Sequence, residues 1–379
     1  MMRKAFKFRL YPNRQQERAM AEMLETHRRL YNNALAEHKN AWEQERRTVS
    51  YGQQSGHLKQ ARMTNPYLAK TNFSSCQATL RRLDKAFQAF FRRMKAGETP
   101  GYPRFKGKHR FDTVEFPSYG DGCKLADGRA YFQHIGYVKI KLHRPLEGQI
   151  KTMSFKGEAD GWHVIFSCDL GELSIEPSAD SPVGIDLGLK ALLITSDGAT
   201  VDPPKFFRKA ERQLRRAQRC LARRKKGSNR RNKVRRQVAK LHLHVKNQRR
   251  DFHHKIARAL IEQYGVVVHE DLNVKAIART RFAKSTHDAG WSSFLAILHR
   301  KAEEAGVQVI AVPPYNTSQV CSQCGCLVPK TLSDRVHVCP HCGYTADRDL
   351  NAARNIERLG IQRLGLSRQA PTAAMVAVV

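Results

Sequence analysis

Residues 320–356 read VCSQCGCLVPKTLSDRVHVCPHCGYTADRDLNAARNI and contain two Cys-x-x-Cys pairs. The cysteines of the two pairs are Cys321, Cys324, Cys339 and Cys342. This spacing lets four thiolates surround one zinc ion tetrahedrally. A glycine follows each pair, as expected at a tight turn with positive φ. We therefore predict a zinc ribbon over residues 318–342, with a short hairpin arm at 336–338. Four thiolates leave no open position for water, so one zinc ion would be structural.

Two other interpretations of the cysteine pairs are a redox centre and a disulfide. The N-terminal sequence MMRKAFKFRL has no apolar signal-peptide core, which predicts a cytosolic protein and favours metal binding over a disulfide. Five further cysteines are scattered along the chain, as buried or spare thiols would be, and none resembles a nucleophile. They are Cys76, Cys123, Cys168, Cys220 and Cys326.

Asp347 and Asp349 come directly after the cysteine pairs, and helix-favouring residues begin after Asp349. This pattern predicts a helix that starts at Asp349 and stops at Gly360. An aspartate at a helix start is often only an N-cap, so this position alone does not indicate catalysis.

The formal net charge is +33 and the isoelectric point is near 10.2, which predicts a polyanionic partner. A membrane surface is a second candidate, but the sequence lacks a basic amphipathic helix or a terminal polybasic tract. No stretch approaches the eighteen or so apolar residues of a membrane span. We therefore expect a soluble protein, no membrane contact, and nucleic acid as the partner.

The N-terminal half alternates strand and helix patterns. Residues 4–10 alternate polar and apolar side chains as a half-buried strand does, and Asn13 then caps a helix over 14–46. A second helix is predicted over 74–94 and should pack on the first. Its arginines face either solvent or nucleic acid. Later β-rich segments, which predict a small barrel or sandwich joined by the N-terminal strand, are 113–116, 131–140, 148–156 and 162–168.

Beyond a predicted linker at 177–182, a strand hairpin over 183–195 carries Asp186 between two glycines, which would let a backbone or a phosphate approach its carboxylate. Residues 205–250 contain twenty Lys or Arg and a single acid, Glu211. Apolar spacing in this segment predicts a helical hairpin broken at 227–229.

A buried strand over 265–272 ends at Glu270, a helix is expected over 291–305, and a further strand over 307–312. Asp186 on a first strand, Glu270 at the end of a later parallel strand and Asp349 opening a helix match the layout in which an RNase H-like fold collects carboxylates. Such a set would hold two divalent cations, and hard oxygen ligands suit Mg²⁺.

With these residues in place, the chain resembles the TnpB family of bacterial insertion sequences, relatives of compact type V CRISPR effectors. The resemblance runs over nearly the whole chain. Its motifs are KFRLYP at 7–12, GYPRFK at 101–106, GIDLG at 184–188, EDL at 270–272, NTS at 316–318 and DRDLNAA at 347–353.

The resemblance implies a multidomain α+β fold. Residues 1–13 and 104–176 would form a wedge-like β-barrel, and 14–103 a helical recognition insert. Residues 177–317 and 343–379 would form an RNase H-like (RuvC) nuclease domain into which the zinc ribbon is inserted. It also implies a bacterial, nucleoid-associated protein in the cytoplasm.

By the same resemblance, Asp186, Glu270 and Asp349 would be catalytic ligands of two Mg²⁺, with Arg335 near the scissile phosphate. Asp349 is preferred to Asp347 because it directly precedes the x-Asn-Ala-Ala run. Partners would be a guide RNA from the element end and a double-stranded DNA target with an adjacent short motif. Expected nucleic-acid contacts are Arg104, Lys106, Arg215, Arg216, Arg223, Arg224, Lys225, Lys226, Arg230, Arg231, Arg235 and Arg236.

The favoured hypothesis is thus an RNA-guided DNA endonuclease. Two alternatives remain open at this point: an RNA-guided DNA-binding repressor that has lost cleavage, and a DNA-joining transposase with a similar acid triad.

Overall fold

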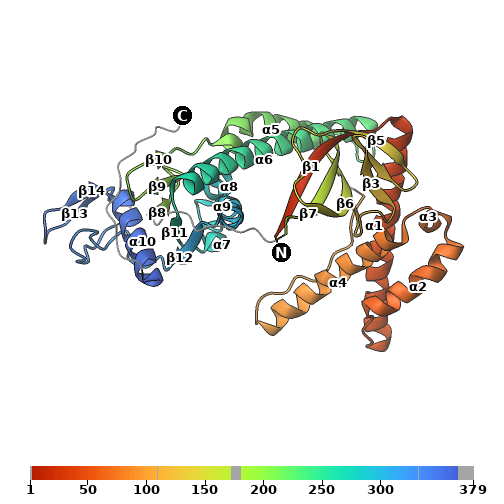
Figure 1. Cartoon of the computed structure of the whole chain (residues 1–379), viewed down its shortest axis with the longest axis horizontal. Helices are drawn as coiled ribbons and strands as arrows, with labels where there is room; N and C mark the ends of the chain where they lie inside the picture. The colour runs from red at the N-terminus through yellow and green to blue at the C-terminus, as the bar shows by residue number, and fades with distance from the viewer. Residues whose placement is uncertain (1, 109, 172–180, 332, 366–379) are drawn as a thin grey trace. The chain divides into compact units, whose positions relative to one another are not determined.

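The structure is a computed structural model that describes residues 2–108, 110–171, 181–331 and 333–365. Its chain divides into two compact units, Met1–Leu173 and Ser174–Val379. The predicted boundary at 176/177 and most of the predicted linker lie outside the described residues. Figure 1 shows the elements of each unit. None of the described helices is long and apolar enough to cross a membrane.

The first unit contains one seven-stranded antiparallel sheet in the order β2-β6-β7-β1-β5-β4-β3. Its strands are β1 (Arg3–Tyr11), β2 (Thr113–Phe116), β3 (Cys123–Ala126), β4 (Arg129–Phe132), β5 (Gly136–Lys141), β6 (Gln149–Glu158) and β7 (Gly161–Asp169). β1 lies between β7 and β5, so the N-terminal strand joins the later strands as predicted. Alternate residues of β1, namely Phe6, Phe8 and Leu10, are buried in the core.

The predicted single β segment at 131–140 is wrong, because it contains a turn. His134 and Gly136 have positive φ (65° and 85°), and Phe132 pairs with Gly136, so β4 and β5 form a tight hairpin. β2 and β3 are the edges of this sheet, and the wedge-like barrel remains a prediction.

All helices of the first unit lie between β1 and β2 in the chain. They are α1 (Arg14–Glu45), α2 (Tyr51–Thr64), α3 (Pro66–Ala69) and α4 (Phe73–Lys95). Asn13 caps α1, as predicted, in a reciprocal capping box with Gln16. α1 and α4 pack together, as predicted, through a core that includes Tyr31, Leu35 and Leu80.

The second unit is built on a five-stranded sheet in the order β10-β9-β8-β11-β12. Its strands are β8 (Pro182–Leu187), β9 (Leu193–Thr195), β10 (Thr200–Val201), β11 (Val266–Glu270) and β12 (Gln308–Val312). β8, β11 and β12 are parallel neighbours, whereas β9 and β10 return antiparallel. β11 lies between β8 and β12, and every residue in it is buried, which suits its run of three valines.

The helices of the second unit are α5 (Phe206–Ala222), α6 (Asn229–Gln263), α7 (Val274–Ile277), α8 (Ala283–Ala289), α9 (Trp291–Ala305) and α10 (Arg348–Leu364). α5 and α6 form the predicted helical hairpin, with Ser228 capping α6. Its turn is fastened by Arg231, whose guanidinium donates to the carbonyl oxygens of Leu221 and Arg224.

The expected end of the last helix at Gly360 is wrong, because α10 continues to Leu364 and ends at Gly365 in the left-handed conformation (φ 66°). Gly360 is buried inside the helix, and a Cβ there would lie 2.3 Å from Cγ2 of Val268 on β11. Gly184 of β8 has a similar role, since a Cβ there would lie 2.0 Å from the carbonyl oxygen of Ala353. Both glycines therefore let α10 approach the sheet closely, and Gly184 faces this helix instead of admitting a phosphate.

Candidate functional site

Asp186 and Glu270 lie side by side at the same end of two parallel strands. Ile185 pairs with His269, so the next residue on each strand is one of these acids. Neighbouring strands are about 4.8 Å apart. Asp349 reaches the site from a third element, the first turn of α10.

The three carboxylates are electrostatically coupled. Burial, followed by repulsion from Glu270, Asp349 and, least strongly, Asp347, raises the pKa of Asp186 to about 8, although Arg348 opposes this shift. Glu270 is only 8% exposed, and burial raises its pKa. The oxygens of these three described carboxylates do not all lie within 4.8 Å of one another. Glu270 and Asp349 are thus close enough for their charges to raise the pKa of Asp186, but the three carboxylates do not form a tight cluster.

Asp347 and Asp349 have different surroundings. Asp347 is the N-cap of α10, and its carboxylate accepts hydrogen bonds from the backbone amides of Asp349 (2.8 Å) and Leu350 (3.4 Å). Asp349 instead pairs with Arg348, whose Nε lies 3.1 Å from Asp349 Oδ1. Asp347 is thus the N-cap, and both acids raise the pKa of Asp186, Asp349 more strongly than Asp347.

Glu270 is held by a buried network that the sequence did not reveal. The hydroxyl of Thr317 donates to Glu270 Oε1 at 2.5 Å, and this bond opposes the burial effect on the Glu270 pKa. The side-chain amide of Asn355 on α10 donates to the carbonyl oxygens of Thr317 (2.8 Å) and Val320 (2.7 Å). Thr317 and Asn355 belong to the NTS run and to the helix after DRDLNAA, so only their motifs could have drawn attention to them.

Asn351 fastens the first cysteine pair to the same helix. Its Oδ1 accepts from the Ser322 amide (2.9 Å), and its Nδ2 donates to the Val320 carbonyl (2.8 Å). Asn351 is fully buried. One helix, α10, therefore carries Asp349 and also fixes both the cysteine pair and, through Thr317, the Glu270 carboxylate.

The four predicted cysteines converge into one group that could hold a metal ion. Cys321 Sγ lies 3.7 Å from Cys342 Sγ, and Cys324 Sγ lies 3.6 Å from Cys339 Sγ. Four sulfurs at 2.3 Å from a tetrahedral zinc would be about 3.8 Å apart, so the group fits zinc. These separations are far longer than the roughly 2.05 Å of a disulfide bond.

The loops around these cysteines also suit thiolates. Gly325 and Gly343 have positive φ, as predicted (79° and 73°). Although burial acts in the opposite direction, hydrogen bonds from backbone amides at Cys342 and His341 lower the pKa of the Cys339 thiol. β13 (Val336–Val338) and β14 (Thr345–Asp347) form the expected hairpin arm as an antiparallel pair.

Arg335 is exposed at the start of this arm, and its carbonyl oxygen accepts a hydrogen bond from the Arg348 amide (2.8 Å). This bond places the Arg335 backbone beside the N-terminus of α10, the helix that carries Asp349. Its proposed contact with the scissile phosphate remains a prediction.

The basic candidates differ in how freely their charges face outward. Arg104, Arg216, Arg223, Arg224, Lys225, Lys226, Arg230 and Arg236 are exposed, and Arg235 is half-buried. Arg215 is exposed but pairs with Glu211 at 2.9 Å. The Lys106 ammonium lies 5.4 Å from the Tyr31 ring centre, and the Arg231 guanidinium serves the hairpin turn. Their contacts with nucleic acid remain predictions.

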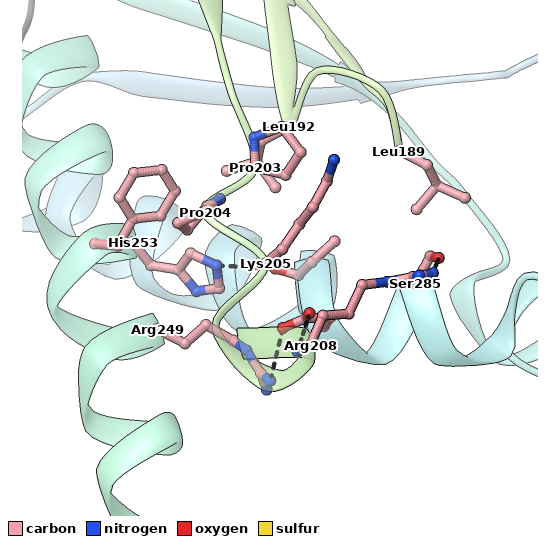
Figure 2. A pocket seen from close by; sticks show the side chains of 12 residues that line it. Leu189, Leu192, Pro203, Pro204, Lys205, Arg208, Arg249, His253 and Ser285 are labelled. Carbon is pink, nitrogen blue, oxygen red and sulfur yellow. Dashed lines mark hydrogen bonds and ion pairs between the residues drawn. The ribbon is translucent and has the colours of Figure 1, made fainter. Parts of the chain in front are cut away.

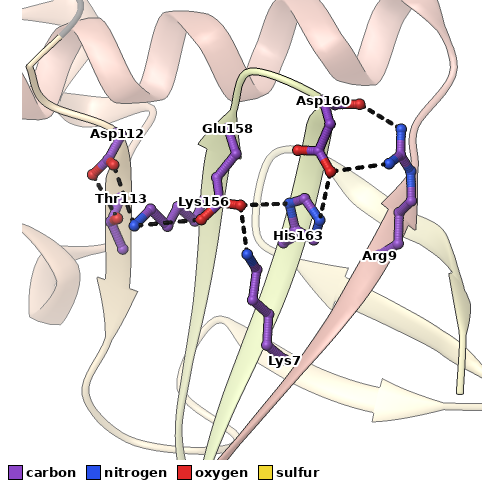
Figure 3. Close-up of polar contacts among 8 residues, drawn as sticks. All are labelled: Lys7, Arg9, Asp112, Thr113, Lys156, Glu158, Asp160 and His163. Carbon is purple, nitrogen blue, oxygen red and sulfur yellow. Dashed lines mark hydrogen bonds and ion pairs between the residues drawn. The ribbon is translucent and has the colours of Figure 1, made fainter. Parts of the chain in front are cut away.

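A second group with metal-ligand chemistry lies in the first unit, where Glu158, Asp160 and His163 come together on the β6–β7 hairpin (Figure 3). Lys7 Nζ on β1 is 2.5 Å from Glu158 Oε2, and the Arg9 Nη1 atom is 3.4 Å from Asp160 Oδ2. Cations of the chain therefore already neutralise these carboxylates, and the group joins the hairpin to β1 as an ion-pair network.

Comparison with known families assigns three parts of the chain. Residues 167–281 match a family described as "Probable transposase", residues 291–356 match the "Cas12f1-like, TNB domain", and residues 1–47 match a "Helix-turn-helix domain". The first match contains Asp186 and Glu270, and the second contains the four cysteines and Asp349.

Relatives match over almost the full length. "Putative RNA-guided DNA endonuclease InsQ" of Escherichia coli K12 is 32% identical over 94% of this chain and 92% of its own length. A Streptomyces pristinaespiralis protein, named "Putative RNA-guided DNA endonuclease", is 31% identical over 95% of this chain and 90% of its own length. The solved mini-RNA-guided endonuclease CRISPR-Cas_phi3 is similar in fold (TM-score 0.50, 11% identity, 98% of this chain and 94% of that one). The chain therefore belongs to the TnpB family.

Proposed function

We propose that the protein is an RNA-guided DNA endonuclease that hydrolyses phosphodiester bonds at Asp186, Glu270 and Asp349. The observation that carries this proposal is the convergence of three acids from β8, β11 and α10 into one field. Full-length relatives bear the name of this activity. The sheet order and the position of each acid also support an RNase H-like (RuvC) domain with an inserted zinc ribbon.

The acid group fits divalent cations. A carboxyl whose pKa is raised to about 8 by burial and by three other acids, Glu270, Asp349 and Asp347, is poorly compensated without added positive charge. Oxygen ligands of this kind suit Mg²⁺. Bound there, two such ions would activate water and stabilise the leaving oxygen.

The residues around the acids have separate tasks. Asp186, Glu270 and Asp349 would together hold the two ions. Thr317 orients Glu270, and Asp347 caps the N-terminus of α10, which fixes the position of Asp349 in the first turn. Arg335 would neutralise charge on the phosphate being cut.

Substitutions of these acids test the proposal. Asp186→Ala should abolish Mg²⁺-dependent cleavage of a guide-matched duplex and leave guide and target binding intact. Asp202→Ala removes an exposed acid of the same unit and is the matched control. Equal cleavage by Asp186→Ala and the parent would refute the assignment of the site.

A second pair of variants separates the neighbouring acids of α10. Asparagine is as good an N-cap as aspartate, so Asp347→Asn should keep the helix start and most activity. Asp349→Asn removes a ligand and should not cut. The reverse pattern would assign the role to Asp347.

The remaining partners follow from the family. The guide RNA would come from the element end, and the DNA target would carry a short adjacent motif. Exposed arginines of the α5–α6 hairpin would track a nucleic-acid backbone by phosphate contacts. Sequencing the RNA that copurifies with the protein identifies the guide.

The two alternatives predict different products. A repressor would bind the guide-matched duplex without cutting it, and the intact acid group argues against that outcome. A transposase would join a labelled element end to target DNA. The first family match is described as a transposase, so strand-transfer products should be sought in the same reactions.

A further inference from the structure

A cavity of about 250 Å³ lies in the second unit, at the base of the α5–α6 hairpin (Figure 2). It is lined by the loop after β8, the segment that leads into α5, one face of α6, and α8. None of the three acids lines it, so it is separate from the catalytic group.

One side of the cavity is cationic. Lys205 extends into it, and its ammonium makes no hydrogen bond or ion pair with the described residues (Figure 2). Lys205 also has a left-handed backbone (φ 51°), a conformation that costs free energy in a residue with a side chain and is often found at functional sites. Arg208 and Arg249 provide two further guanidinium groups, and Arg249 Nε is buried without a partner among the described residues.

A single acid, Asp288, faces these three cations, and its oxygens are occupied. They accept the backbone amides of Phe207 (2.9 Å) and Arg208 (3.2 Å), and Oδ1 lies 3.6 Å from Arg249 Nη2. The first amides of α5 are therefore already satisfied. The lining carries a net positive charge that suits an anion.

His253 offers a hydrogen-bond acceptor on the same lining. It is 1% exposed, and its Nε2 lies 3.0 Å from the carbonyl oxygen of Ala289. A carbonyl oxygen only accepts, so Nε2 carries the proton and Nδ1 of the neutral ring is an acceptor. This Nδ1 is buried and has no partner among the described residues. A ligand here would therefore bring a donor as well as an anion.

The lining also contains apolar side chains, including Leu189, Pro204 and Phe252. An anion, a donor and an apolar surface in one ligand describe a nucleotide, whose phosphate, base amino or imino group and ring faces match the three parts of the lining. The volume is too small for a duplex.

The cavity is also close to the catalytic group along the chain. Leu189 follows Asp186 by three residues, so their Cα atoms are at most about 10 Å apart. That span equals about three nucleotide steps at 3.4 Å of helix rise.

We propose that this cavity is a subsite for one nucleotide of the DNA strand being cut, with its phosphate on Lys205 and Arg208. This inference rests on the proposed function. It assigns a strand-positioning role to residues outside the acid group.

The test combines Lys205→Gln with single uncharged methylphosphonate replacements along the cut strand. In the parent, one position within about three nucleotides of the cleaved bond should lower strand affinity about tenfold, as expected for one charge-assisted hydrogen bond. Lys205→Gln should cause a similar loss, and the two changes together should be no worse than either alone. Affinity is measured in an Asp186→Ala background, so the result does not depend on cleavage.

Lys209→Gln is the matched control, because Lys209 is exposed one helical turn further along α5 and does not line the cavity. The loss of strand affinity caused by Lys209→Gln should add to the loss caused by a methylphosphonate at any position. Additive behaviour of Lys205→Gln at all positions would overturn the proposal, as would coupling to substitutions in the guide RNA instead of the cut strand. Cleavage of the unmodified duplex by the parent separately tests the proposed function.

Discussion

Thr317→Val removes one hydroxyl and keeps the side-chain volume, so it isolates the bond between Thr317 and Glu270. Both side chains are almost completely buried (5% and 8% exposed), so water cannot easily replace the lost donor. A hydrogen bond to a charged group contributes about 1.5–3 kcal/mol. If this free energy holds the carboxylate in its working position, cleavage should slow about 10- to 100-fold. The Glu270 pKa should also rise, because burial would no longer be opposed by this bond.

Cleavage of a guide-matched duplex should be measured over a series of Mg²⁺ concentrations. For Thr317→Val we expect a higher midpoint as well as a lower maximal rate, with guide and target binding unchanged. Thr317→Ser keeps the hydroxyl and should recover most of the activity despite the loss of a methyl group. Two results would refute the reasoning: equal defects in the serine and valine variants, or a defect that follows only the thermal stability of the variants.

Four further predictions concern the fold and its partners. Gly360→Ala should destabilise the second unit by about 1–3 kcal/mol, because the added methyl group would overpack against β11. Gly56→Ala should instead stabilise α2 by up to about 1 kcal/mol, because no atom lies within 4 Å of the new Cβ. Thermal unfolding of the two variants measures both effects. Cys324→Ser should lower the zinc content found by elemental analysis, and a parent without zinc would refute the metal assignment. Replacing residues 223–226 with Gln should make the slope of log RNA affinity against log salt concentration less steep, by up to about 4. An unchanged slope would show that these four charges face solvent. Burial is the main cause that lowers the pKa of His27 to about 3. The free energy of unfolding should therefore be unaffected by His27 above pH 6.5 and should fall as the pH drops from 6.5 towards 3, by up to about 1.4 kcal/mol per pH unit. His27→Gln should abolish this decline.

Much of the fold could be predicted because the elements involved are governed by local patterns. Capping by Asn13, the broken helical hairpin and the buried strand that ends at Glu270 all follow from side-chain periodicity and turn residues. The two cysteine pairs were equally predictable, because metal geometry restricts ligand spacing. The turn inside residues 131–140 was missed because His134 adopts positive φ there, which a residue with a side chain rarely does.

Other features depend on contacts between residues distant in the chain, which periodicity does not encode. Gly360 resembled a helix stop because glycine commonly ends helices, yet its neighbour Val268 is on a strand far earlier in the sequence. Arg231 resembled every other arginine of the basic hairpin, and only the fold shows that two carbonyl oxygens occupy its guanidinium. A count of basic residues therefore overstates the charge available to a nucleic acid.

Contacts between residues distant in the chain also link the cysteine pairs to the acid group. α10 packs on β8 and β11 without side chains at Gly184 and Gly360, so its first turn is held at the end of the strands that carry Asp186 and Glu270. Asn355 then fixes the backbone at Thr317 and Val320, directly before the first cysteine. Movement of the cysteine group would therefore displace residues 317–320, the segment that orients Glu270. Loss of metal from the cysteines should therefore reduce cleavage through the Thr317–Glu270 bond, even though no cysteine touches the acids.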